Sequence, residues 1–180
     1  MLDQFTNTQL IAAAGVFAIV ATTTGALYLT YRRTRTRGFR TRFGPEYDRA
    51  VVTHGASRKA EAKLADRLTH VKTLKLRDLG FVERERFVAE WQAVQARFVE
   101  HPKSAVTQAN ELISSLLAAR GYPKGNFEQR AADISVNYPR LMEDYRRASA
   151  VAVRPGRADA STEELRRAMI QYRAIFDGLV

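Results

Sequence analysis

Residues 10–31, LIAAAGVFAIVATTTGALYLTY, contain no charged side chain. At ~1.5 Å per residue, an α-helix of this length measures roughly 33 Å, which matches the ~30 Å hydrocarbon core of a bilayer. Phe5, Tyr28 and Tyr31 lie near its two ends, where aromatic rings anchor membrane helices at the water interface. The stretch therefore predicts one transmembrane helix over residues 10–31.

A basic collar, residues 32–42, follows the apolar stretch directly. It contains six arginines: Arg32, Arg33, Arg35, Arg37, Arg40 and Arg42. Before it, Asp3 is the only charged side chain. Basic flanks stay on the cytoplasmic side of a membrane, so we expect residues 1–9 outside and the C-terminal part inside. We expect the collar to attract the anionic inner-leaflet lipids of a plasma membrane.

Export after cleavage is the alternative to an anchor. Thr24, Gly25 and Ala26 are small enough to resemble a signal-peptide cleavage site. A signal peptide, however, begins with a positively charged region and has a shorter apolar region, whereas the first basic residue here is Arg32. The absence of cysteine neither requires nor excludes an oxidising compartment. We therefore favour the anchor and keep an exported envelope protein as the alternative.

Residues 43–180 are enough for one soluble domain. They hold 23 of the 29 Lys and Arg and 18 of the 19 Asp and Glu, so this part is only mildly basic. Proline, glycine and apolar residues at helical spacing predict successive helices. Their expected ranges are 45–52, 57–71, 82–100, 102–119, 127–134, 139–151 and 162–179.

Particular residues indicate where these helices start, stop and pack. Ser161 and Glu164 have the spacing of a capping box at the start of the last helix. A break is expected at Arg154, Pro155 and Gly156. The helix over 82–100 places Trp91 on an aromatic stripe, and the helix over 102–119 has a wide apolar stripe that predicts a central position. Because no alternation of period two persists, we expect an all-α fold: one N-terminal transmembrane helix followed by a compact multi-helix domain.

Catalytic and metal-binding patterns are absent from the sequence. His54, His70 and His101 do not have metal-ligand spacing, and there is no cysteine nucleophile or glycine-rich phosphate loop. The closely spaced carboxylates, Glu83 with Glu85 and Glu163 with Glu164, do not face a common point on a helix. We therefore expect no catalytic residue, cofactor or metal, and no enzyme activity.

One polar cluster follows a glycine-containing turn and is a candidate recognition patch. Its residues are Tyr122, Phe127, Glu128, Arg130 and Asp133. The alternative is structural: Phe127 packs inward and the charged residues form an ion-pair network.

Two arginine doublets, Arg146 with Arg147 and Arg166 with Arg167, raise the possibility of a basic surface for phosphate groups. Neighbouring acidic residues neutralise both doublets locally, which argues against nucleic-acid binding. A membrane-tethered binder of phosphate ligands or nucleic acid is thus an alternative function.

Small residues lie along one stripe of the predicted span: Ala14, Ala18, Ala21 and Gly25. Such a stripe lets two membrane helices approach closely. A homodimer through this face is one possible assembly, and the soluble domain is another source of self-association.

Four stretches, RFGPEYDRAV (42–51), FVAEWQAVQARFVEHPKSAVTQANELI (87–113), RGYPKGNFEQRAADISVNYP (120–139) and ASTEELRRAMIQYRAIFDGL (160–179), resemble an uncharacterised family of bacterial single-span or putatively secreted helical proteins. The resemblance implies a bacterial source and a helical module, and it transfers no catalytic or binding residue. Together these features predict a membrane-anchored cytoplasmic module for interaction or scaffolding, with an unknown protein partner.

Overall fold

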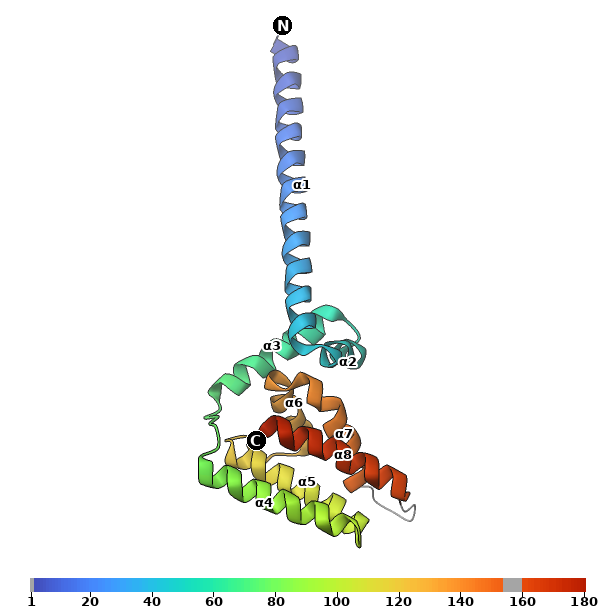
Figure 1. Cartoon of the computed structure of the whole chain (residues 1–180). Helices are drawn as coiled ribbons and strands as arrows, with labels where there is room; N and C mark the ends of the chain where they lie inside the picture. Colours follow the sequence, from blue (N-terminus) through green and yellow to red (C-terminus); the bar gives the residue numbers. More distant parts are fainter. Residues whose placement is uncertain (1, 154–159) are drawn as a thin grey trace. The chain divides into compact units, whose positions relative to one another are not determined.

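The computed structural model describes residues 2–153 and 160–180, and the side chains of 2–11 and 13 lie outside the description. Within these residues all regular structure is helical, without a β-strand (Figure 1), so the predicted all-α class is confirmed. The expected break at Arg154, Pro155 and Gly156 lies outside the described residues. Contacts divide the chain into two units, Met1–Arg42 and Phe43–Val180.

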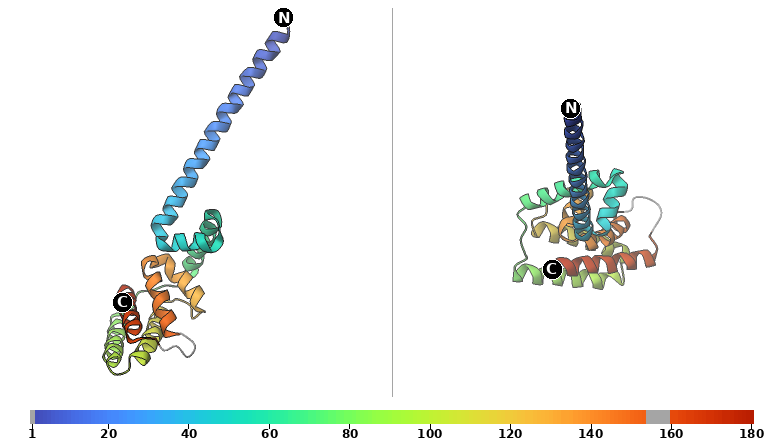
Figure 2. Two further views of the ribbon diagram at one scale, coloured as in Figure 1. Left: turned by 90° about the vertical axis from the view of Figure 1, so that its right-hand side faces the viewer. Right: turned by 90° about the horizontal axis from the view of Figure 1, so that it is seen from above.

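The first unit is a single helix. α1 runs from Leu2 to Phe43 without interruption (Figures 1 and 2), so the basic collar prolongs the apolar helix. Between Ala14 and Phe43 it is long and apolar enough to cross a membrane, by length and composition. Phe17 is 76% exposed and Leu27 is 70% exposed. The most apolar part of α1 is not buried by other described residues, and a signal sequence near the N-terminus would share these features.

The second unit contains the remaining helices of the described chain. They are α2 (Pro45–His54), α3 (Ser57–Thr73), α4 (Phe81–Phe98), α5 (Pro102–Ala119), α6 (Phe127–Asn137), the 3₁₀-helix η1 (Pro139–Leu141), α7 (Met142–Ala152) and α8 (Thr162–Leu179). All predicted helices are present, and α6 continues three residues beyond the expected Ile134.

The helix expected from Pro139 onwards begins differently from the prediction. Residues 139–141 form η1, in which the Leu141 N–H donates to the Tyr138 carbonyl at 3.1 Å, and the α-helix starts at Met142. Proline has no N–H to donate, and a short 3₁₀ turn is a common way to begin a helix after it.

Local chemistry fixes several helix ends. Pro45 and Pro102 occupy the first turns of α2 and α5, where the missing proline N–H costs nothing. Gly55 ends α2 with a φ of 71°, a left-handed conformation that glycine adopts without strain. At α8 the predicted capping box is confirmed: the Glu164 N–H donates to Ser161 Oγ at 3.2 Å, and the Ser161 N–H donates to Glu164 Oε2 at 2.8 Å.

α5 is the central helix of the second unit. It contacts α4, α7 and α8 (Figures 1 and 2), and its apolar face, including Ile113 and Leu116, is fully buried. Trp91 of α4 stacks on Phe176 of α8, with ring centroids 5.0 Å apart. The predicted central position of residues 102–119 and the core position of Trp91 are therefore confirmed.

α2 and α3 pack against each other on another side of this core. α3 also contacts α6, and α2 contacts η1. Two buried side chains join the pair, since the Tyr47 hydroxyl donates to Glu61 Oε1 at 3.3 Å. This arrangement leaves α5, α6 and α7 to form the walls of a cavity.

Candidate functional site

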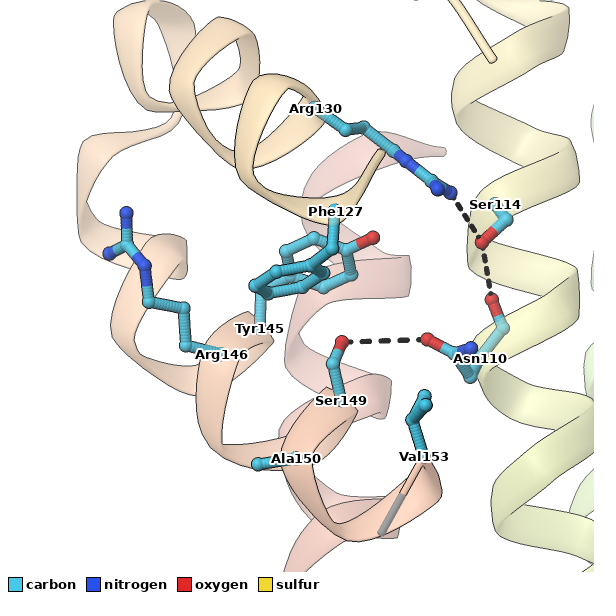
Figure 3. A pocket seen from close by; sticks show the side chains of 9 residues that line it. All are labelled: Asn110, Ser114, Phe127, Arg130, Tyr145, Arg146, Ser149, Ala150 and Val153. Atoms are coloured by element: carbon cyan, nitrogen blue, oxygen red, sulfur yellow. Dashed lines mark hydrogen bonds between the residues drawn. The ribbon is translucent and has the colours of Figure 1, made fainter. Parts of the chain in front are cut away.

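A cavity of about 400 Å³ lies between α5, α6 and α7. Figure 3 shows Asn110 and Ser114 on one helix facing Ser149 and the Tyr145 ring on another. The lining comprises Asn110 and Ser114 of α5, Phe127 and Arg130 of α6, and Tyr145, Arg146, Ser149, Ala150 and the following Val153 at α7. A concave site of this size, mostly apolar with a few converging polar groups, is the usual form of a small-ligand pocket.

The start of α6 sets the position of Arg130. Asn126 caps this helix by accepting a hydrogen bond from the Gln129 N–H at 2.8 Å. One turn later, Arg130 Nη1 donates to Ser114 Oγ at 2.7 Å (Figure 3). Its Nη2 donates to the Gly125 carbonyl at 3.1 Å. The side chain thereby connects α6 to the polar face of α5.

Arg130 has no counter-charge among the described residues. No described carboxylate oxygen lies within 4.0 Å of its nitrogens, and both of its hydrogen-bond acceptors are neutral. Its Nε is buried and has no hydrogen-bond partner among the described atoms. A partly buried cation of this kind carries an uncompensated desolvation cost, which an anion in the cavity would reduce.

Asn110 is the centre of a small polar network in the cavity wall. Its Oδ1 accepts a hydrogen bond from the Tyr172 hydroxyl at 3.0 Å and from Ser149 Oγ at 3.4 Å. Its backbone carbonyl accepts from Ser114 Oγ at 2.8 Å. With both acceptors occupied, the group of Asn110 that remains is its amide nitrogen, a donor.

The phenols next to this network are protonated at neutral pH. Burial raises the pKa of Tyr145 and, more strongly, the pKa of Tyr172. Both hydroxyls therefore act as neutral hydrogen-bonding groups rather than bases. The Tyr145 ring lies against Phe127, with centroids 5.2 Å apart and planes tilted by 32°, so the two rings form an aromatic wall.

Arg146 also lines the cavity, but it is bound to a carboxylate that it shares with Arg67. Both of its Nη atoms donate to the Glu46 carboxylate of α2, and Arg67 Nη1 of α3 lies 3.8 Å from Glu46 Oε2. In Figure 3 the Arg146 guanidinium is directed away from Ser149 and Asn110. The cavity thus combines one paired and one unpaired arginine.

The residues of the predicted recognition patch do not share one surface. Phe127 and Arg130 line the cavity. Tyr122 is buried, and its hydroxyl accepts from Asn137 Nδ2 at 3.0 Å. Glu128 is exposed, whereas the side chain of Asp133 is fully buried.

Asp133 faces α3 instead of the cavity. Its Oδ1 accepts from Gln129 Nε2 at 2.9 Å and lies 3.6 Å from His70 Nε2. Burial raises the pKa of Asp133, while the nearby His70 and the hydrogen bond from Gln129 act in the opposite direction. Asp133 therefore belongs to a polar contact between α3 and α6.

The arginine doublets are paired with acidic residues. Arg147 donates to Glu143, and Arg166 and Arg167 both donate to Glu163, at 2.9 Å in each case from Nε. Together with the pairing of Arg146 with Glu46, each arginine of the two doublets has a carboxylate partner. Across the residues that the structure describes, no cluster of His, Asp and Glu has the arrangement of a metal site.

In α1, the small residues of the predicted stripe and the arginines of the basic collar are exposed. These small residues are Ala14, Ala18, Ala21 and Gly25. In the collar, the Arg32 guanidinium lies 5.9 Å from the Tyr28 ring centroid and Arg35 lies 5.8 Å from that of Phe39. Arg33, Arg37, Arg40 and Arg42 belong to the same continuous helix.

The polar wall of the cavity, formed by Asn110 and Ser114 of α5 with partners from α7, was not predicted from the sequence. Asn110 and Ser114 lie beside the apolar stripe of α5, and their spacing of four residues places them on one face. This pair of polar residues beside the apolar stripe is the feature of the sequence from which the polar wall could have been predicted. The partners from α7, Ser149 and Tyr145, could not be assigned without knowing which helices meet.

The chain matches no family model, curated protein or solved structure. The resemblance to bacterial single-span helical proteins therefore stays a prediction, and the site must be interpreted from its own geometry.

Proposed function

We propose that this chain is a single-pass plasma-membrane protein that holds a non-catalytic helical module, residues 43–180, on the cytoplasmic side for binding and scaffolding. The observation that carries the proposal is α1, an unburied apolar helix that continues directly into six arginines. Exposed apolar side chains such as Phe17 and Leu27 would be costly in water and are favourable in lipid.

The internal hydrogen bonds of α1 suit a lipid environment. The hydroxyls of Thr22 and Thr23 donate to carbonyls one turn earlier, Ala18 and Ile19, at 2.8 Å each. Polar groups within a bilayer must be satisfied inside the helix because no water is available. These threonines therefore add little to the cost of insertion.

The arrangement of charge supports a crossing helix over one that lies flat on the membrane. A surface-bound amphipathic helix has a charged face and an apolar face along its whole length. In α1, residues 10–31 contain no charged side chain on any side, and the arginines follow as a separate block in 32–42. Because basic flanks favour the cytoplasmic side, this order supports an inside location for the second unit.

The lining of the cavity supports binding rather than catalysis. Among the described residues of the lining there is no aspartate, glutamate, histidine or cysteine, the side chains that most often transfer protons or attack substrates. The paired arginine doublets offer no specific support for nucleic-acid binding.

The proposal can be tested by membrane fractionation of the full chain expressed in bacteria. We expect the protein to pellet with membranes, to resist alkaline washing and to have the mass of the uncleaved chain. Val20→Arg, near the middle of the apolar stretch, should lower the membrane-inserted fraction, because an arginine at a helix centre costs about 3 kcal/mol of apparent insertion free energy. Gly38→Arg adds the same charge in the collar and should leave insertion unchanged.

Two outcomes would contradict the proposal. A shortened chain that is released from the membrane would indicate cleavage and an exported protein. Full-length wild-type protein in the soluble fraction, with no effect of Val20→Arg, would show that α1 is not a membrane anchor.

A further inference from the structure

We propose that the cavity between α5, α6 and α7 binds a small organic monoanion, a carboxylate with an apolar body. All residues of this cavity belong to the second unit, so the proposed binding does not depend on whether that unit is cytoplasmic or exported.

The charge of the ligand follows from Arg130. A guanidinium has five N–H donors, and Arg130 uses two of them, toward Ser114 and Gly125. No described carboxylate compensates it. A carboxylate near this side chain would form charge-assisted hydrogen bonds, which are shorter and stronger than neutral ones.

A single negative charge fits the lining better than two. The second arginine, Arg146, shares the Glu46 carboxylate with Arg67, and its guanidinium is directed away from Ser149 and Asn110 (Figure 3). Among the described residues, Arg130 is therefore the lining cation that a ligand can reach. A dianionic phosphate would contact only this one guanidinium. Arg130 and Ser114 also border a neighbouring cavity of about 390 Å³ that contains Lys124, and a phosphate arm in the experiment below tests that possibility.

The rest of the lining suits an apolar body. Phe127 and Tyr145 form the aromatic wall, and the exposed Ala150 and Val153 complete an apolar rim. Apolar surface that leaves water against such walls gains free energy in proportion to its area. The ligand class is therefore an amphipathic molecule with one anionic end.

Neutral donors would orient the anionic end. Asn110 retains its amide nitrogen as a donor, because Tyr172 and Ser149 occupy its Oδ1. Ser114 donates to the Asn110 carbonyl and accepts from Arg130, so it holds the guanidinium in place. Arg130 is thus the binding residue, and Ser114 is a positioning residue.

Isothermal titration calorimetry of the full chain in neutral detergent micelles tests this assignment, with protein-free micelles as the blank. The probe is 4-phenylbutyrate, and the matched neutral compound is 4-phenylbutyramide. We expect the carboxylate to bind with a Kd below about 1 mM and the amide to bind at least about tenfold more weakly, because one charge-assisted contact is lost. Inorganic phosphate at the same ionic strength should not displace 4-phenylbutyrate.

Variants locate the site. Arg130→Met should weaken binding of 4-phenylbutyrate at least tenfold, whereas Arg130→Lys, which keeps the charge, should recover part of that loss. Arg173→Met is the matched control: Arg173 borders an apolar groove between α4 and α8 and pairs with Asp177, and its loss should leave the Kd unchanged. Ala150→Phe fills the exposed rim and should block binding without removing a hydrogen bond, which keeps the test decisive if Arg130→Met fails to fold.

Equal affinity for the carboxylate and the amide would overturn the assignment, since the cavity would then be a purely apolar site. Equal losses in Arg130→Met and Arg173→Met would show a nonspecific charge effect. Full displacement by phosphate would assign the site to phosphate groups, and no measurable binding at millimolar 4-phenylbutyrate would contradict the proposed ligand class.

Discussion

Glu46 joins helices that are far apart in the sequence. Its carboxylate is almost fully buried, accepts hydrogen bonds from Arg146 of α7, and lies 3.8 Å from Arg67 of α3. Two cations of different helices thus share one buried anion. Such a group gives specificity because any other packing of α2 would leave charges unpaired, and its removal is costly for the same reason.

Glu46→Gln should destabilise the second unit by about 3 kcal/mol, the lower end of the range for breaking a buried ion pair. Urea unfolding of the full chain in neutral micelles measures this change, with the fluorescence of Trp91, the only tryptophan, as the probe of the core. Glu143→Gln is the control, because the pair of Glu143 with Arg147 is exposed on both sides and is worth less than about 1 kcal/mol. Equal losses for the two variants would contradict the role of Glu46.

Glu83 makes a pH-dependent contribution at the start of α4. It accepts hydrogen bonds from Arg77 at 2.6 and 2.7 Å and from the Gly80 N–H at 3.1 Å. The hydrogen bonds from Arg77, followed by the one from Gly80, lower the pKa of Glu83 from 4.5 to about 2. The folded state therefore binds fewer protons than the unfolded state between these values, and the stabilisation is present above about pH 4.5 and lost as the pH falls through about 2.

Glu83→Gln should therefore lower stability above pH 4.5, and its difference from wild type should shrink as the pH is lowered toward 2. Unfolding curves between pH 2.5 and 7 give this difference. Glu85→Gln removes an exposed carboxylate of the same helix that has no ion pair with a described residue, and it should show no such trend. A Glu83→Gln difference that is constant with pH would rule out the proposed pairing.

At the scale of elements, the turn after α5 is the most constrained connection. Gly121 has a φ of 93°, and a Cβ at this position would collide with the Lys75 carbonyl of the segment before α4. The Arg77 N–H donates to the Arg120 carbonyl at 3.0 Å beside it. Two segments distant in sequence therefore meet where only glycine fits.

Gly121→Ala should lower the free energy of unfolding by about 3 kcal/mol. A left-handed backbone conformation costs an alanine about 1–2 kcal/mol, and the steric overlap with Lys75 adds a similar amount. Gly55→Ala provides the matched comparison: its φ is 71°, but nothing lies within 4 Å of the added Cβ. Gly55→Ala should lower the free energy of unfolding only by the cost of the left-handed backbone conformation, about 1–2 kcal/mol. Urea unfolding separates the two, and equal costs would show that the close approach to Lys75 is not important.

Elements whose ends depend on neighbouring residues were predictable from the sequence. Pro102, Ser161 with Glu164, and Gly55 act within one turn of chain, so the starts of α5 and α8 and the end of α2 follow from local chemistry. The 3₁₀ start at Pro139 was not predicted, because proline permits either an α- or a 3₁₀-turn and packing decides between them.

At the scale of the whole molecule, the candidate site could be predicted only in part. Phe127 and Arg130 were recognised from their local polar cluster, but their partnership with Asn110 and Ser149 depends on which helices meet. Asp133 was assigned to a recognition patch, with a structural ion-pair network as the alternative, and its contact with His70 across the interface of α3 and α6 also depends on which helices meet. Contacts between distant helices leave no periodic signal in the sequence, whereas the apolar and basic blocks of α1 are visible in it directly.

We propose that residues 43–180 lie on the cytoplasmic side of the membrane. Because the chain has no cysteine, single cysteines can report the location of each end of α1. Asn7→Cys precedes the apolar stretch, and Lys59→Cys is exposed on α3. Both are treated with a membrane-impermeant maleimide in intact bacterial spheroplasts, and again after lysis.

We expect Asn7→Cys to be labelled in intact spheroplasts and Lys59→Cys to be labelled only after lysis, both on full-length protein. Labelling of Lys59→Cys in intact spheroplasts would contradict the cytoplasmic module.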